Sequence, residues 1–314
     1  MIQDLFFSRL DGRLHGMTFF RKLGTVLEMI KFEHSIFALP FALTGALLAV
    51  RGAELTGNEL AGKFGWIVVA MVAARSAAMA FNRLIDAEID ARNPRTSMRA
   101  IPAGLVSKPF TWGFVIFWCV AFFGAAYQLN TLCFQLAPVA LLVLFGYSYT
   151  KRVTAFSHFV LGFALGIAPT AAWIAIRGTL DPAILLLTAA VTFWTAGFDI
   201  IYSCQDVDFD NEEGLYSLPR LLGLRKALHI ARLLHGLMVL CLVWLSQSLG
   251  LGLFSLAGIA VVAVLLIYEH SLVKPYDLSR VNAAFFTVNG VVSVVFFLFW
   301  AADIFWGTQT RIQG

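Results

Sequence analysis

The stretch FGWIVVAMVAARSAAMAFNRLIDAEID, residues 64–90, joins a long apolar run to regularly spaced polar side chains. Its apolar part, residues 64–85, is long enough to cross a bilayer, since one crossing needs about 20 apolar residues. Its end carries Asn82, Asp86 and Asp90 at intervals of four residues, so these three oxygen-bearing side chains share one helix face. The stretch therefore predicts a transmembrane helix that ends in a row of polar ligands.

The composition of the whole chain also indicates a membrane protein. Of its 314 residues, 59% are hydrophobic and 13% are charged, which leaves too few polar side chains to cover a soluble globule of this size. Apolar stretches of membrane-spanning length occur at 32–50, 64–85, 110–128, 131–149, 155–177, 181–205, 228–247, 251–270 and 283–306. We therefore expect an all-α integral membrane protein, a bundle of about nine transmembrane helices in one domain over residues 1–314.

The loops between these spans predict an orientation in the membrane. The short links at 129–130 and 178–180 predict tight helical hairpins on one side, and the long loops lie on the other side with the basic N-terminal segment, residues 1–31. This second side holds 18 of the 23 Lys and Arg residues. The positive-inside rule then places the N-terminus and the long loops in the cytoplasm and the C-terminus outside.

The opposite side carries four basic residues, Arg51, Lys63, Arg177 and Arg311. Because loops at the membrane surface account for the positive net charge of +4, we expect the lipid bilayer as partner and no nucleic acid.

A second row of oxygen-bearing side chains ends the sixth predicted span. Tyr202, Asp206 and Asp210 repeat the four-residue spacing, and each lies 120 residues after a member of the first row. Both rows are expected at the cytoplasmic face, which suggests two related halves.

The two rows together favour a magnesium diphosphate site. Mg²⁺ prefers oxygen ligands and usually takes one or two protein carboxylates, completing its shell with water and substrate phosphates. A single acidic cluster at a helix end is more often merely solvated or paired with loop arginines, but two clusters at matched spacing favour binding. The predicted metal ligands are Asn82, Asp86, Asp90, Asp206 and Asp210.

Cationic side chains in the following loops complete the predicted site. Arg95 and Arg99 lie in a segment that prolines and glycine keep out of a regular helix, and arginine offers forked donors that suit phosphate. Tyr147, Lys151 and Arg152 end the fourth span on the same face. For the last two residues, ordinary positive-inside anchoring remains the alternative.

Two ionisable residues lie deeper, about two helical turns from the rows. Asp199 and Arg75 require either a partner or a polar cavity at this depth, so they predict a mutual salt bridge or a direct role in a polar pocket. The histidines show no ligand pair at helical spacing, and no histidine chemistry is expected.

At these residues the chain resembles the UbiA superfamily of intramembrane prenyltransferases. The family's first motif, Asn-Asp-x-x-Asp-x-x-x-Asp, stands here as Asn82-Arg83-x-x-Asp86-x-x-x-Asp90, so Arg83 replaces an aspartate but none of the three residues on the ligand face. The second motif stands as Asp206-x-x-x-Asp210, and Tyr147-x-x-x-Lys151 matches the third signature, in a cytoplasmic loop.

The segments at 31–40 and 75–86 look like the bacterial branch of 4-hydroxybenzoate polyprenyltransferases. The resemblance implies a bacterial inner-membrane enzyme that uses Mg²⁺ to transfer a polyprenyl group from polyprenyl diphosphate to the ring of an aromatic acid in quinone biosynthesis. The expected acceptor is 4-hydroxybenzoate, of the ubiquinone pathway. The alternative is 1,4-dihydroxy-6-naphthoate, because part of this branch is assigned to menaquinone synthesis by the futalosine route.

The roles expected within this chemistry divide between the rows and the loops. The candidate catalytic residues are Asp199, Tyr202, Lys151 and Arg152, and the candidate diphosphate ligands are Arg95, Arg99, Lys151 and Tyr147. We expect the acceptor carboxylate near Asp199, Arg99 and Arg152. A secondary transporter is the alternative from another class, although its charges should centre at mid-membrane rather than at helix ends.

Overall fold

The computed structural model of this chain describes residues 19–29, 37–51 and 53–307. Residues 1–18 of the predicted N-terminal segment, residues 32–36 of the first predicted span, and Arg311 lie outside the described residues.

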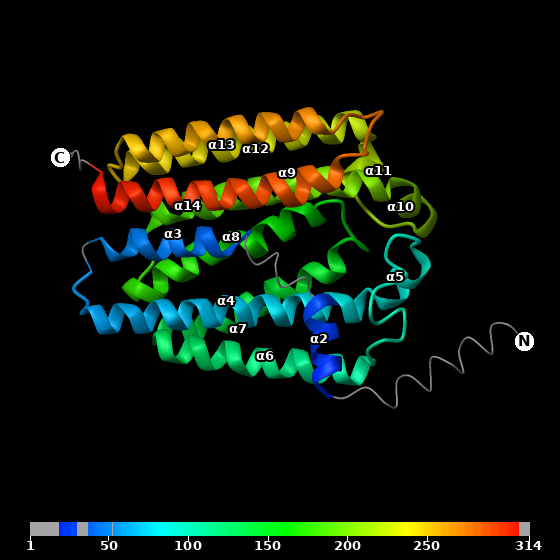
Figure 1. Cartoon of the computed structure of the whole chain (residues 1–314), viewed down its shortest axis with the longest axis horizontal. Helices are drawn as coiled ribbons and strands as arrows, with labels where there is room; N and C mark the ends of the chain where they lie inside the picture. The colour runs from blue at the N-terminus through cyan, green and yellow to red at the C-terminus, as the bar shows by residue number, and fades with distance from the viewer. Residues whose placement is uncertain (1–18, 30–36, 52, 308–314) are drawn as a thin grey trace, which may run out of the picture.

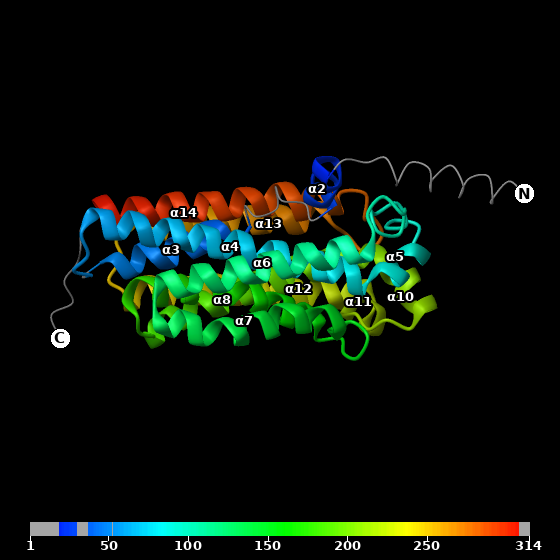
Figure 2. The same ribbon diagram turned by 90° about the horizontal axis from the view of Figure 1, so that it is seen from below.

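The described residues form an all-helical bundle in which the long helices run side by side (Figures 1 and 2). Eight segments of this part of the chain are long and apolar enough to cross a membrane. They are built on α4 (Gly57–Ile85), α6 (Lys108–Leu129), α7 (Thr131–Thr150), α8 (Ser157–Arg177), α9 (Leu185–Ser203), α12 (Leu224–Ser248), α13 (Leu253–Leu272) and α14 (Asn289–Trp306). With the shorter apolar helix α3 (Leu39–Val50), they confirm the prediction of about nine spans.

Short helices and loops gather at one end of this bundle, which we call the polar end (Figure 1, right). It holds α5 (Ala87–Arg92), α10 (Val207–Glu213) and α11 (Leu218–Leu222), with α2 (Phe19–Met29) nearby. A 3₁₀ turn, Cys204–Asp206, connects α9 to α10, and a π-helical segment, Ala283–Val288, leads into α14. Both acidic rows therefore end at the same end of the bundle.

The start of α4 differs from the prediction because a helix cap outweighs hydropathy there. The helix begins at Gly57 rather than at residue 64. Thr56 and Glu59 form a capping box, in which the Thr56 backbone N–H donates to the Glu59 carboxylate at 2.9 Å. The cap satisfies backbone donors that the first turn leaves unpaired, so the helix extends into a polar stretch.

The two predicted hairpins are present at the other end of the bundle. Asn130 ends α6 and caps α7, since its side chain accepts a hydrogen bond from the Cys133 N–H at 2.8 Å. The same side chain donates to the carbonyl of Ile174 at 2.8 Å and so joins this hairpin to the end of α8. Gly178 ends α8 with a φ of 71°, the left-handed conformation that glycine adopts without steric cost.

Small residues let α8 approach two neighbouring helices closely. A Cβ atom built on Gly45 of α3 lies 2.3 Å from the carbonyl oxygen of Pro169 in α8. A Cβ atom on Gly162 of α8 lies equally close, at 2.3 Å, to the carbonyl oxygen of Thr192 in α9. Because lipid tails give no hydrophobic drive between helices, such close backbone packing is an important source of association in a bilayer.

We expect Gly45→Val to lower the midpoint of thermal unfolding in detergent, because overpacking typically costs about 1–3 kcal/mol. Gly113→Val is the matched control, since Gly113 is exposed on α6 and has no atom within 4 Å of an added Cβ. Equal midpoints for both variants would contradict the close contact between α3 and α8.

Candidate active site

The first acidic row stays on one helix face across the break between α4 and α5. Asp86 is the residue between the two helices, and its backbone N–H still donates to the carbonyl of Asn82 at 2.9 Å. The Asp90 N–H likewise donates to the carbonyl of Asp86 at 2.7 Å. The i to i−4 bonds therefore carry the helical repeat through the break, and the row keeps the predicted spacing.

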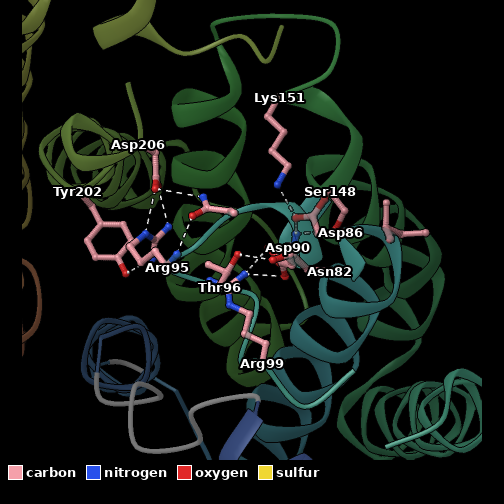
Figure 3. Close-up of polar contacts among 12 residues, drawn as sticks. Asn82, Asp86, Asp90, Arg95, Thr96, Arg99, Ser148, Lys151, Tyr202 and Asp206 are labelled. Carbon is pink, nitrogen blue, oxygen red and sulfur yellow. Dashed lines mark hydrogen bonds and ion pairs between the residues drawn. The ribbon is translucent and has the colours of Figure 1, made fainter. Parts of the chain in front are cut away.

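The Asp86 carboxylate is the centre of a buried ionic network (Figure 3). It accepts hydrogen bonds from Lys151 Nζ at 2.6 Å, Arg152 Nη2 at 3.2 Å and Asn82 Nδ2 at 3.1 Å. Its side chain is 3% exposed, whereas that of Lys151 is 32% exposed. The two cations at the end of α7 thus bind the first motif rather than merely anchoring the helix at a membrane surface.

The loop after α5 brings two arginines onto two further carboxylates. Arg99 Nη1 donates to both carboxylate oxygens of Asp90, each at 2.7 Å. Arg95 reaches the second row, with Nε 2.9 Å from Asp206 Oδ1 and Nη2 2.6 Å from Oδ2 (Figure 3). Because both nitrogens of this fork engage one carboxylate, the contact fixes distance and orientation together.

Arg95 also contacts the aromatic part of the second row. Its Nη1 donates to the Tyr202 hydroxyl at 3.0 Å. The centroid of the Tyr202 ring lies 4.2 Å from that of Phe285, in the π-helical segment before α14. Burial lowers the pKa of Arg95, but the hydrogen bond with Asp206 raises it, and the net pKa lies above its ordinary value. The guanidinium therefore stays charged where the two rows meet.

Asp210 is held by a hydroxyl group. Its Oδ2 accepts a hydrogen bond from Ser217 Oγ at 2.7 Å, and both side chains are buried. Tyr216, the residue before Ser217, donates its backbone N–H to the carbonyl of Lys151 at 2.8 Å. The segment after α10 thus links the second row to the cations that bind Asp86.

An apolar cavity extends from this network into the bundle. It measures about 1400 Å³ including its open mouth and lies between α3, α4, α6, α7 and α8. Asn82 and Tyr147 line it on the side of the network, and 12 of its 29 lining residues are alanines, whose small side chains leave the space open. Arg75 is the one cation among these lining residues, and its Nε has no hydrogen-bond partner in the described part of the chain.

The predicted salt bridge between Arg75 and Asp199 is not formed. Asp199 Oδ2 instead lies 2.7 Å from Nδ1 of His158, at the start of α8. We expected no histidine chemistry from the sequence, and this contact between His158 and Asp199 was not predicted. The two residues are 41 positions apart and lie on different helices. Helical spacing of three or four residues within one segment carries no information about such a pair.

Each of the two acidic rows supplies part of a candidate Mg²⁺ site. Among the described residues, no three His, Cys, Asp or Glu side chains are placed to hold one metal ion by themselves. The two rows offer carboxylate and amide oxygens, which are the ligands that hard divalent cations prefer. Mg²⁺ usually takes only one or two protein carboxylates. A diphosphate between the rows would supply the remaining oxygens.

A family profile and a curated relative that match this chain both bear the names of prenyltransferases. The profile of the UbiA prenyltransferase family matches residues 38–299. A curated relative from Vibrio cholerae, named 4-hydroxybenzoate octaprenyltransferase, is 33% identical over 217 residues, which cover 69% of this chain and 76% of the relative.

Two solved structures share the fold. The apo structure of a UbiA homologue from Aeropyrum pernix K1 has a TM-score of 0.78 at 33% identity and covers 87% of this chain and 99% of its own. The structure of a UbiA homologue from Archaeoglobus fulgidus, bound to DMAPP and Mg²⁺, has a TM-score of 0.66 at 20% identity over 89% of this chain and 99% of its own.

The ion pairs of Asp86 with Lys151 and Arg152 should weaken the binding of diphosphate in the absence of metal. Asp86→Ala should bind inorganic diphosphate several-fold more tightly than the unaltered protein when a chelator removes metals, because Lys151 and Arg152 lose their carboxylate. Isothermal titration calorimetry measures this affinity. Glu88→Ala, two residues further along in α5, is the control, since the Glu88 side chain is 82% exposed. Unchanged metal-free affinity in Asp86→Ala would show that these cations do not face the anion.

Proposed function

This chain belongs to the UbiA prenyltransferase family and is a membrane prenyltransferase, and we propose that it transfers a polyprenyl group from polyprenyl diphosphate to the ring of an aromatic acid. The observation that carries the proposal is the ion-pair network beside an apolar cavity: its carboxylates suit Mg²⁺, and its cations suit a diphosphate.

The diphosphate site is assigned to the network itself. Bound Mg²⁺ would neutralise the diphosphate and stabilise it as a leaving group. The ligands for Mg²⁺ are Asn82, Asp86, Asp90, Asp206 and Asp210, and the donors for the phosphate oxygens are Arg95, Arg99, Lys151, Arg152 and Tyr147. Each cation would exchange a carboxylate for phosphate, so little charge would be left unpaired. The Archaeoglobus fulgidus homologue, which shares the fold, was solved bound to DMAPP and Mg²⁺, and this supports a site that takes both ligands.

The apolar cavity is the proposed site of the prenyl chain. Its lining on α4 runs from Ile67 to Asn82, a length of about 22 Å at 1.5 Å per residue. An isoprenoid chain is apolar, and an apolar cavity binds it by excluding water from both surfaces. Asn82 and Tyr147 line both the cavity and the network end, so the reactive end of the chain would lie beside the carboxylates.

Arg75 is the proposed partner of the acceptor carboxylate. Arg99 and Arg152, which the sequence suggested for this role, are bound to Asp90 and Asp86. Arg75 lines the cavity two turns from Asn82, and its Nε has no partner in the described part of the chain, although an intramembrane charge needs one. An aromatic acid supplies both the counter-ion and the electron-rich ring.

The preferred acceptor in this proposal is 4-hydroxybenzoate, in ubiquinone biosynthesis, supported by the name of the Vibrio cholerae relative. The alternative acceptor, 1,4-dihydroxy-6-naphthoate, also carries a carboxylate and would use the same cation. The transporter alternative is not retained, because the family is one of prenyltransferases and the carboxylates gather at the polar end. We further propose that the polar end faces the cytoplasm of a bacterial cell, with the C-terminus outside, as the positive-inside rule predicts.

Prenyl transfer by purified protein in lipid tests the proposal. With Mg²⁺, a long-chain prenyl diphosphate and each acceptor in turn, we expect product from the unaltered protein and a loss of about 100-fold or more in Asp86→Asn and Asp206→Asn. Asp208→Asn is the control, since Asp208 lies on the exposed side of α10 between two predicted ligands. Activity in both Asn variants equal to that of Asp208→Asn would refute the assigned metal site.

A second experiment tests the acceptor site. Arg75→Gln should raise KM for 4-hydroxybenzoate about 10-fold or more, because a hydrogen bond to a charged group contributes about 1.5–3 kcal/mol. The same variant should leave the KM of the uncharged methyl ester close to that of the unaltered protein. An equal effect on acid and ester would argue against a carboxylate contact.

A further inference from the structure

His158 and Asp199 form a contact that the diphosphate site does not use. The His158 side chain is 3% exposed and lies in the first turn of α8, and its Nδ1 is 2.7 Å from Asp199 Oδ2 on α9. The Asp199 side chain is 18% exposed. The contact therefore joins a buried imidazole to a carboxylate that remains open on one side.

The other neighbour of His158 determines which group donates the hydrogen bond. The backbone N–H of Leu218 points to Nε2 of His158 at 3.4 Å, so Nε2 must be an acceptor with a free lone pair. The proton of the neutral imidazole is then on Nδ1, which donates it to Asp199. Asp199 Oδ2 therefore accepts a hydrogen bond from a neutral imidazole rather than pairing with a cation.

The second oxygen of Asp199 remains available, and the residue lies near one side chain that lines the cavity. Asp199 Oδ1 has no hydrogen-bond partner among the described residues, and Asp199 lies close enough to Tyr147 for its charge to act on that phenol. Tyr147 lines the cavity. Asp199 also lies seven residues before Asp206, about two helical turns from the second acidic row.

We propose that Asp199 is the base that removes the ring proton of the acceptor, and that His158 is the positioning residue that aims it. This proposal rests on the proposed prenyl transfer. The ring carbon ortho to the hydroxyl forms a bond to the allylic carbon, while the carbon–oxygen bond to the diphosphate breaks and its electron pair leaves with the diphosphate. The ring carbon–hydrogen bond then breaks, its electron pair restores the aromatic ring, and the proton goes to Asp199 Oδ1.

His158 also links this base to the second acidic row. The segment that supplies the Leu218 N–H begins with Ser217, whose hydroxyl binds Asp210. One short segment therefore contacts both the positioning residue and a proposed metal ligand. This connection sets the position of the base relative to the leaving group, which matters because general-base catalysis requires hydrogen-bond reach to the proton.

Ring-deuterated acceptor tests the proposal through a quantity that a purely structural contact would not change. The probe is 4-hydroxybenzoate with deuterium at both positions ortho to the hydroxyl, compared with the unlabelled acid. We expect Asp199→Asn to lower kcat about 100-fold or more, the usual contribution of a general base, and to show a primary isotope effect larger than that of the unaltered protein. His158→Ala should change both quantities in the same direction by smaller amounts.

The conservative variant separates positioning from folding. His158→Asn keeps an N–H donor close to the place of Nδ1, so it should restore most of the activity and the isotope effect of the unaltered protein. His229→Ala is the control, because His229 is exposed on α12 and bonds only the carbonyl of Arg225. The melting midpoint of each variant in detergent separates loss of fold from loss of chemistry.

Two results would overturn the proposal while leaving the proposed function intact. One is kcat within a few-fold of the unaltered protein in Asp199→Asn; the other is slow turnover in Asp199→Asn and His158→Ala with an unchanged isotope effect. If the unaltered protein gave no product with any aromatic acid, the proposed function itself would fail, and the base with it.

Discussion

The carboxylate of Asp86, 3% exposed and bound by Lys151, Arg152 and Asn82, is the contact on which the polar end depends. Removing an ion from water costs several kcal/mol, and a buried carboxylate persists only when donors surround it. Here the donors come from α4 and from the end of α7, so the charge can be buried only where these two helices end together. The helix ends, the loops and the second acidic row are arranged around this requirement.

The same constraint separates the charged and apolar parts of the molecule. The four cations that bind Asp86, Asp90 and Asp206 at the polar end are 26% to 35% exposed, and alanine-rich helix faces line the cavity behind them. Two ionisable residues of the bundle interior are placed differently from these ion pairs. Arg75 lines the cavity, whereas Asp199 binds a neutral imidazole and keeps one oxygen free. Such placement suits a reaction between a charged head group, an apolar chain and an aromatic acid.

Periodicity in the sequence was sufficient for the bundle and for each acidic row, because helical spacing within one segment fixes which side chains share a face. Side-chain contacts between different segments could not be predicted from this spacing. The fork of Arg95 on Asp206 depends on the path of a loop, and the pairing of Asp199 with His158 rather than Arg75 depends on how α8 packs on α9. The early start of α4 was missed because a capping box, not hydropathy, sets it.

On substrate binding, the ion pairs of the polar end should exchange partners, so that carboxylates bind Mg²⁺ and cations bind diphosphate. An experimental structure with Mg²⁺ and a non-cleavable prenyl thiodiphosphate would reveal this exchange. We expect Asp86 and Asp206 within coordination distance of Mg²⁺, Lys151 and Arg95 on phosphate oxygens, and the prenyl chain in the alanine-lined cavity. A bound analogue that leaves both ion pairs intact, with its chain outside that cavity, would contradict this expectation.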